Sequence, residues 1–181
     1  MIIEHFLEET LNNLIGPSKE QIIVFNQWAA RALDEYHQDS NTQMNFNLDG
    51  ISSTVQLSWN SDFPKDAMNE KKKIAEEGGV SLAFFVMSVL LDYRYVQQTE
   101  IGTGVDYRFK KTVPDSLNFL DQSHFIEISA ILEESATNTL KKRIEQKHQQ
   151  INRGARKNEE SSVIVTLFTD PIAVKETHVR I

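Results

Sequence analysis

The order of apolar patterns between residues 66 and 168 is the feature that most restricts the fold of this chain. The patterns predict, in order, a helix at about 66–91, strands at 94–101, 104–110 and 124–132, a helix at about 136–152 and a strand at 161–168. Strands that follow one another directly pair as an antiparallel meander, whereas a strand reached through a helix pairs in parallel. The order therefore predicts an α/β layer fold with a three-strand meander and one helical crossover.

The residues before this region predict helices and a hairpin. Apolar residues recur at helical spacing over 2–15 and again over 19–38, where Ser18 is a candidate N-cap. The stretch QMNFNLDGISSTVQLSW, residues 43–59, alternates apolar and polar residues on both sides of an Asp-Gly pair. Such a pair between alternating segments is typical of a β-hairpin turn.

We expect one domain over 1–181, because no linker long enough to divide the chain is present. Residues 1–62 form an N-terminal addition of helices and hairpin, and residues 63–170 form the core. Residues 171–181 form a C-terminal tail or an edge strand, since Pro171 ends the last core strand.

Two glycines, Gly78 and Gly79, stand inside the helix predicted over 66–91. Each weakens a helix by about 1 kcal/mol relative to alanine. Either the backbone approaches another element closely at this point, or the helix is broken in two.

Composition excludes several classes of protein. The 181 residues are 40% hydrophobic and 25% charged, a balance that is typical of a globular domain. The chain has no cysteine, which excludes disulfide scaffolds and thiolate metal sites. No stretch of about 18 apolar residues predicts a membrane span, and the acidic start lacks the basic region of a signal peptide. We therefore expect a cytoplasmic protein without a membrane partner.

Positive charge is concentrated in one segment of an otherwise acidic chain. The chain carries a net charge of −7, but residues 138–157 hold seven cations and one acid, a net +6. The cations are Lys141, Lys142, Arg143, Lys147, Arg153, Arg156 and Lys157. The segment is either the solvated face of a helix or a surface for an anionic partner, with Lys141, Lys142, Arg143 and Lys147 as the candidate nucleic-acid contacts.

Two carboxylates stand inside neighbouring predicted strands, which disfavour buried acids. Alternation places Asp106 on the same strand face as Arg108 and Lys110, and Glu127 on the same face as Ser129. If the strands pair, the two carboxylates lie close together and need a proton or a cation between them. Mg²⁺ is the usual cation for oxygen ligands of this kind, with Mn²⁺ as a substitute. The alternative is that Arg108, Lys110 or a helix N-terminus pairs with them.

The order of elements and these residues together resemble the PD-(D/E)XK nuclease superfamily over about 66–169. GVDYRF supplies the acidic residue of the second strand, Asp106, and IEIS supplies Glu127 on the third. AEEGG offers Glu76 or Glu77 on the first helix. The sequence IGTGVDY followed by EIS is also similar to a set of small bacterial proteins of uncharacterised activity. The superfamily resemblance implies a restriction-endonuclease-like core.

The resemblance also implies a chemistry and a departure from it. It implies metal-dependent hydrolysis of phosphodiester bonds, with Mg²⁺ held by Asp106, Glu127 and the carbonyl of Ile128. Where the family has a lysine, this chain has Ser129, which carries no charge. The candidates to replace that lysine are Lys110, Lys141 and Lys142.

Three classes of function fit these residues. The first is a nuclease acting on DNA or RNA, as a subunit of a bacterial defence or nucleic-acid-processing assembly. The second is a catalytically inactive protein of the same fold that binds nucleic acid, a protein partner or a second copy of itself. The third is an acidic interaction or inhibitor protein whose carboxylates are structural. The first two require Asp106 and Glu127 to converge on a solvent-reachable cleft near Glu76 or Glu77.

Overall fold

The computed structural model describes residues 3–111, 123–155 and 159–179. This part of the chain forms an α/β fold with three α-helices and one mixed sheet of eight strands. The helices are α1 (Lys19–Tyr36), α2 (Lys71–Phe85) and α3 (Leu140–Arg153). The strands are β1 (Ile3–Phe6), β2 (Asn41–Leu48), β3 (Ile51–Ser58), β4 (Tyr95–Gln98), β5 (Tyr107–Lys110), β6 (His124–Ile131), β7 (Ser161–Leu167) and β8 (Ile172–Thr177). Short 3₁₀ segments, η1 (Leu7–Asn13) and η2 (Lys65–Ala67), and a π-helical turn, η3 (Val86–Leu90), complete the elements.

The predicted meander and crossover are both confirmed. Strands β4, β5 and β6 pair antiparallel in chain order, and β6 pairs in parallel with β7 through α3. The full strand order is β1-β3-β2-β8-β7-β6-β5-β4. Strands β6 and β7 therefore lie inside the sheet, and β4 lies at one edge.

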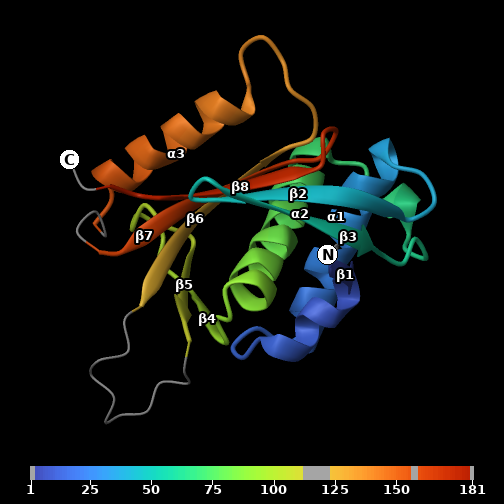
Figure 1. Ribbon diagram of the computed structural model, residues 1–181, viewed down its shortest axis with the longest axis horizontal. Coiled ribbons are helices and arrows are strands. Elements are labelled where there is room, and N and C mark those ends of the chain that lie inside the picture. The colour runs from blue at the N-terminus through green and yellow to red at the C-terminus, as the bar shows by residue number, and fades with distance from the viewer. Residues whose placement is uncertain (1–2, 112–122, 156–158, 180–181) are drawn as a thin grey trace.

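The helices cover the two faces of the sheet unequally (Figure 1). Helices α1 and α2 pack together on one face, over the larger core that contains Phe84, Phe109, Ile126 and Ile164. Helix α3 lies on the other face over a smaller apolar cluster. Side chains alternate along β6, so neighbouring residues of that strand face different helices.

The C-terminal segment is a correction to the prediction. Residues 171–181 were expected to form a tail or an edge strand, but β8 lies between β7 and β2. It pairs antiparallel with β7 and parallel with β2, so it joins the hairpin to the core sheet. Two neighbours satisfy its backbone groups, and this non-local pairing is invisible to local patterning.

The helix predicted over 2–15 is wrong at its start, which is a strand, and in its type, since the helical part is a 3₁₀ segment. The region expected as a helix over 2–15 forms β1 and η1 where it is described. Strand β1 pairs in parallel with β3, with Ile3 opposite Val55. Pairing with the open edge of β3 satisfies backbone groups of both strands, and this tertiary gain outweighs the helical spacing of the apolar residues.

The second helix and the hairpin follow the prediction. Ser18 caps α1 in a capping box, since its hydroxyl accepts from the backbone N–H of Gln21 and the Gln21 side chain accepts from that of Ser18. Strands β2 and β3 are joined by Asp49 and Gly50, with φ of 53° and 87°. Two consecutive positive φ angles are what a type I′ hairpin turn requires.

Close approach, and not a break, explains the two glycines. Helix α2 is continuous through both of them. A Cβ on Gly79 would lie 2.7 Å from the Cβ of Ala130 on β6, and one on Gly78 would lie 3.1 Å from the Cα of Ala29 on α1. The glycines therefore let α2 sit directly against the sheet and against α1. Among the described residues, no helix is long and apolar enough to cross a bilayer.

Candidate functional site

The sheet is open beside the second half of β6. Strand β5 pairs with β6 at only three positions, from His124 to Ile126, whereas β6 continues to Ile131. Asp106 stands directly before β5, where the chain enters the sheet. Its backbone N–H donates to the Ile126 carbonyl at 2.8 Å. The backbone groups of β6 that a longer β5 would pair with therefore face a cavity.

The Asp106 side chain takes the place of the missing strand. Its Oδ2 accepts a hydrogen bond of 2.7 Å from the backbone N–H of Ile128. The N–H and C=O groups of one strand residue point to the same side, so the Ile128 carbonyl also faces this open edge. Burial raises the pKa of Asp106, while the Ile128 N–H, Lys147 and a hydrogen bond with the Glu127 side chain act in the opposite direction.

Glu127 lies beside it on the face of β6 that α3 covers. Its side chain is 0% exposed, and its Oε1 accepts from Lys147 Nζ at 2.5 Å and from Gln150 Nε2 at 2.7 Å. Its Oε2 is buried and has no hydrogen-bond partner within the described residues. Burial and the nearby Asp106 carboxylate raise the pKa of Glu127 to about 7, against the opposing effect of Lys147. The two carboxyl groups, Asp106 and Glu127, can therefore lie together only if one of them takes up a proton or a cation neutralises their charge.

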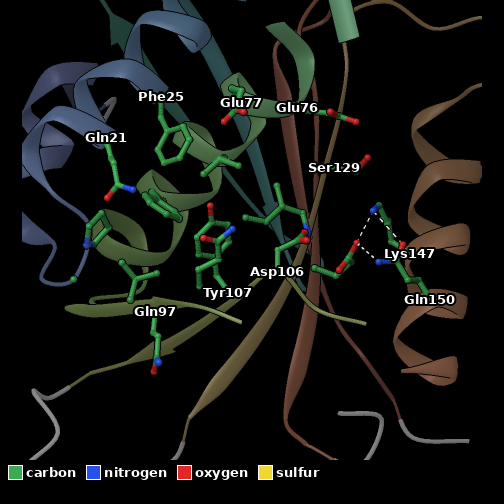
Figure 2. A pocket seen from close by; sticks show the side chains of 18 of the residues that line it. Gln21, Phe25, Glu76, Glu77, Gln97, Asp106, Tyr107, Ser129, Lys147 and Gln150 are labelled. Atoms are coloured by element: carbon green, nitrogen blue, oxygen red, sulfur yellow. Dashed lines mark hydrogen bonds and ion pairs between the residues drawn. The ribbon is translucent and has the colours of Figure 1, made fainter. Parts of the chain in front are cut away.

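A cavity of about 720 Å³ opens onto these side chains (Figure 2). Asp106 and Glu127 line it together with Glu76 and Glu77. These two acids lie on α2, about one turn before its close contact with β6. Arg143 and Lys147 of α3 also line it. The wall on the α1 side includes Gln21 and Phe25, and the wall on the β4–β5 side includes Tyr95, Gln97, Gln98 and Tyr107. The predicted convergence of the two carboxylates near Glu76 and Glu77 is therefore present.

The lysine at this site was predicted for a different role. The candidates to replace the family's lysine were Lys110, Lys141 and Lys142, but none of them lines the cavity. Lys110 is buried at the far end of β5, and Lys141 is exposed on α3. Lys142 donates to the Ala136 carbonyl at 3.0 Å. Lys147, expected as a nucleic-acid contact, is the lysine that reaches Glu127.

The signal for Lys147 is present in the sequence. Helix α3 buries Ile144 and Ile151 against the sheet, with Leu140 partly buried beside them. At 3.6 residues per turn, position 147 falls in the middle of that apolar stripe. A lysine there has to be neutralised on the face of the sheet, and Glu127 is the acid that it meets. Gln150, one turn later on α3, was not predicted as a site residue, and no comparable sequence pattern indicates its role.

The remaining predicted residues are distributed between the cavity and the surface. Ser129 and Arg143 line the cavity, whereas Lys141 and Lys142 lie on the exposed side of α3. The alternative pairing of Asp106 with Arg108 is not seen, because Arg108 Nε donates to Ser123 Oγ at 2.7 Å. Arg156 and Lys157 of the basic segment lie outside the described residues.

The donor set fits one hard divalent cation with a largely aqueous shell. No group of three or more His, Cys, Asp and Glu side chains suited to a metal occurs in residues 3–111, 123–155 and 159–179. Mg²⁺, however, is commonly bound by one or two carboxylates and keeps several waters. Asp106, the unpartnered oxygen of Glu127 and the Ile128 carbonyl are such a set.

The chain matches no family model, no curated protein and no solved structure. No family assignment follows from sequence or fold comparison. The conclusions on function below rest on the topology and on the side chains of the cavity.

Proposed function

We propose that this protein is a divalent-cation-dependent phosphodiesterase with a restriction-endonuclease-like core, acting on nucleic acid. The observation that carries the proposal is the convergence of Asp106, Glu127 and Lys147 on one open cavity, with an oxygen of Glu127 left without a partner. The order α2, β4, β5, β6, α3, β7 supports it, because it has the superfamily's helix, meander, helix and strand in the same sequence.

The chain's own residues have distinct roles in this proposal. Asp106, Glu127 and the Ile128 carbonyl hold the cation, and Gln150 fixes the orientation of the Glu127 carboxylate. When bound, Mg²⁺ or Mn²⁺ supplies Lewis-acid polarisation of the phosphate and lowers the pKa of water. Lys147 provides the positive charge that Ser129 cannot, next to the phosphate oxygens. It positions the attacking water and stabilises the charge that develops on the phosphate.

A catalytically inactive nucleic-acid-binding or partner-binding protein of the same architecture is the second candidate. It is favoured by the ion pair between Glu127 and Lys147, which already satisfies one carboxylate oxygen without a metal. In that case the acids stabilise the fold, and the cavity binds its ligand without hydrolysing it.

Hydrolysis of labelled DNA and RNA oligonucleotides with Mg²⁺, Mn²⁺ or EDTA separates the two candidates. The wild-type protein should cleave only with a divalent cation, and Asp106→Asn and Glu127→Gln should each lower the rate by at least about 100-fold. Glu145→Gln is the matched control, since Glu145 is exposed on α3 and does not line the cavity. Binding without cleavage under every condition would reject the enzyme and leave the second candidate.

A further inference from the structure

A second cavity continues from the first past the open edge of β6. It has a volume of about 510 Å³ and lies between the first turns of α2, the end of β6 and the start of α3. Glu76, Ser129 and Arg143 line both cavities. The two cavities are therefore neighbouring parts of one groove, with these three residues at the junction.

The charge changes along this groove. Four carboxylates and two cations line the first cavity. In the second, the cations are Lys71, Lys72 and Arg143, and the acids are Glu76 and Glu133. Lys72 and Glu76 form only a long, exposed ion pair of 3.8 Å, which solvent screens strongly. The groove thus runs from an acidic end, suited to a metal ion, to an end with an excess of positive charge.

Arg143 at the junction has unused hydrogen-bonding capacity. Its Nη2 donates to Asn138 Oδ1 at 2.7 Å, which holds the guanidinium in place. Its Nε is buried and has no hydrogen-bond partner within the described residues. The guanidinium lines both cavities, and its positive charge is therefore placed where a phosphodiester oxygen could contact it.

The second cavity also has an apolar wall. Tyr36, Ile131 and Leu132 line it together with the lysines. An aromatic ring beside a cationic track is the combination that binds single-stranded nucleic acid, because a base stacks on the ring while its phosphate contacts the cations.

We propose that the second cavity binds the nucleotide next to the scissile phosphodiester of a single polynucleotide strand. This inference rests on the proposed function of the first cavity. Arg143 contacts the adjoining phosphate, Lys71 and Lys72 contact the next one, and Tyr36 contacts the base. A base can stack on Tyr36 only when it is unpaired and unstacked, so a duplex would first have to be opened. The substrate is therefore a single strand or a frayed end.

Two substrates of different length test this inference separately from the proposed function. Bis(4-nitrophenyl) phosphate is a small diester that needs only the first cavity. A fluorescein-labelled octamer, tested as dT₈, as rU₈ and as a DNA duplex, extends into the second. The test variant is Lys71→Gln with Lys72→Gln, and the charge-matched control is Lys111→Gln with Arg153→Gln, whose sites do not line either cavity.

The test variant should hydrolyse the small diester at the wild-type rate. Its KM for the single-stranded octamers should rise about tenfold with kcat unchanged, and its salt dependence should weaken by roughly one phosphate contact, the one that the two lysines share. An octamer KM equal to that of the control, or tighter binding of the duplex than of either single strand, would overturn the inference.

If the wild type hydrolyses neither the small diester nor the octamers, the proposed catalytic function fails, but the second cavity is still tested. Fluorescence anisotropy then measures octamer binding directly. The test variant should bind the single-stranded octamers about tenfold more weakly than the control, and equal binding by the two variants would reject the site. Comparison of dT₈ with rU₈ identifies which of the two nucleic acids the groove prefers.

Discussion

Lys147 on α3 and Glu127 on β6 form an ion pair across the helix–sheet interface, with Nζ 2.5 Å from Oε1. Gln150, on the next turn of α3, donates to the same oxygen. Both donors from α3 therefore use one side of the carboxylate, and Oε2 is left without a partner in the described part of the chain. A buried carboxylate oxygen without a donor is costly for folding alone. Either a proton between Glu127 and Asp106 or a bound cation relieves that cost.

Removing the Lys147 charge should abolish turnover and spare metal binding. Lys147→Met should lower the hydrolysis rate by about 100-fold or more, because the lysine acts on the phosphate and the water. Its affinity for Mn²⁺ should stay the same or rise, since a competing cation is gone from Glu127. Initial rates and calorimetric titration measure the two effects. Turnover within twofold of the wild type would show that Lys147 is only structural; Lys111→Met is the control for the lost charge.

Asp106 should be structural as well as functional. Asp106→Ala leaves the backbone N–H of Ile128 without its acceptor, and should cost about 1–3 kcal/mol in the free energy of unfolding. Asp106→Asn keeps an acceptor oxygen and should cost less than Asp106→Ala. Urea unfolding of the metal-free proteins measures both values. Equal stability of the alanine and asparagine variants would contradict the role of this hydrogen bond.

The contact between α2 and β6 should depend on Gly79. Gly79→Ala places a Cβ 2.7 Å from that of Ala130, so the helix must move away from the sheet at a cost of about 1–3 kcal/mol. The gain in helix propensity, about 1 kcal/mol, offsets only part of this cost. Thermal or urea unfolding of the double variant with Ala130→Gly should show recovery. A single variant more stable than the wild type would mean that the two backbones are not pressed together.

His124 should make the protein acid-sensitive. Its Nδ1 lies 2.9 Å from Glu160 Oε1 and its Nε2 lies 2.8 Å from Ser162 Oγ, in a site where burial lowers the pKa of the imidazole. Glu160 and Asp49 raise that pKa and Lys175 lowers it further, and the net shift is downward.

The unfolded chain therefore takes up this proton at a higher pH than the folded chain does. The contribution to stability is present above the ordinary histidine pKa of 6.5 and is lost as the pH falls through and below it. Urea unfolding between about pH 7.5 and pH 5 should show a steeper loss for the wild type than for His124→Gln. Parallel pH profiles of the two proteins would contradict this assignment.

Much of the core could be predicted because its signals are local. The Asp-Gly turn, the Ser18 cap and the positions of the core strands each depend on neighbouring residues, and all three are confirmed. The strand predicted over 104–110 is shorter than expected, Tyr107–Lys110, so Asp106 lies just before it and not inside it. The meander also predicted that Asp106 and Glu127 would lie close together if their strands paired, and the two strands do pair. The pair at the centre of the site was therefore visible before the fold.

What could not be predicted depends on contacts between distant segments. The parallel pairing of β1 with β3 and the central place of β8 are set by partners far along the chain, and local spacing carries no information on them. The stripe of Ile144 and Ile151 places Lys147 on the buried side of α3, but which acid it meets depends on the strand against which the helix packs. The second cavity arises only when α2, β6 and α3 are brought together.

The most direct test of the central claim is calorimetric titration of the protein with Mn²⁺ and Mg²⁺. The wild type should bind one ion per chain, and the double variant Asp106→Asn with Glu127→Gln should bind none. Glu145→Gln, which removes an exposed acid from α3, should bind as the wild type does. Equal binding by the wild type and the double variant, or binding by neither protein, would show that these carboxylates do not form a metal site and would contradict the account.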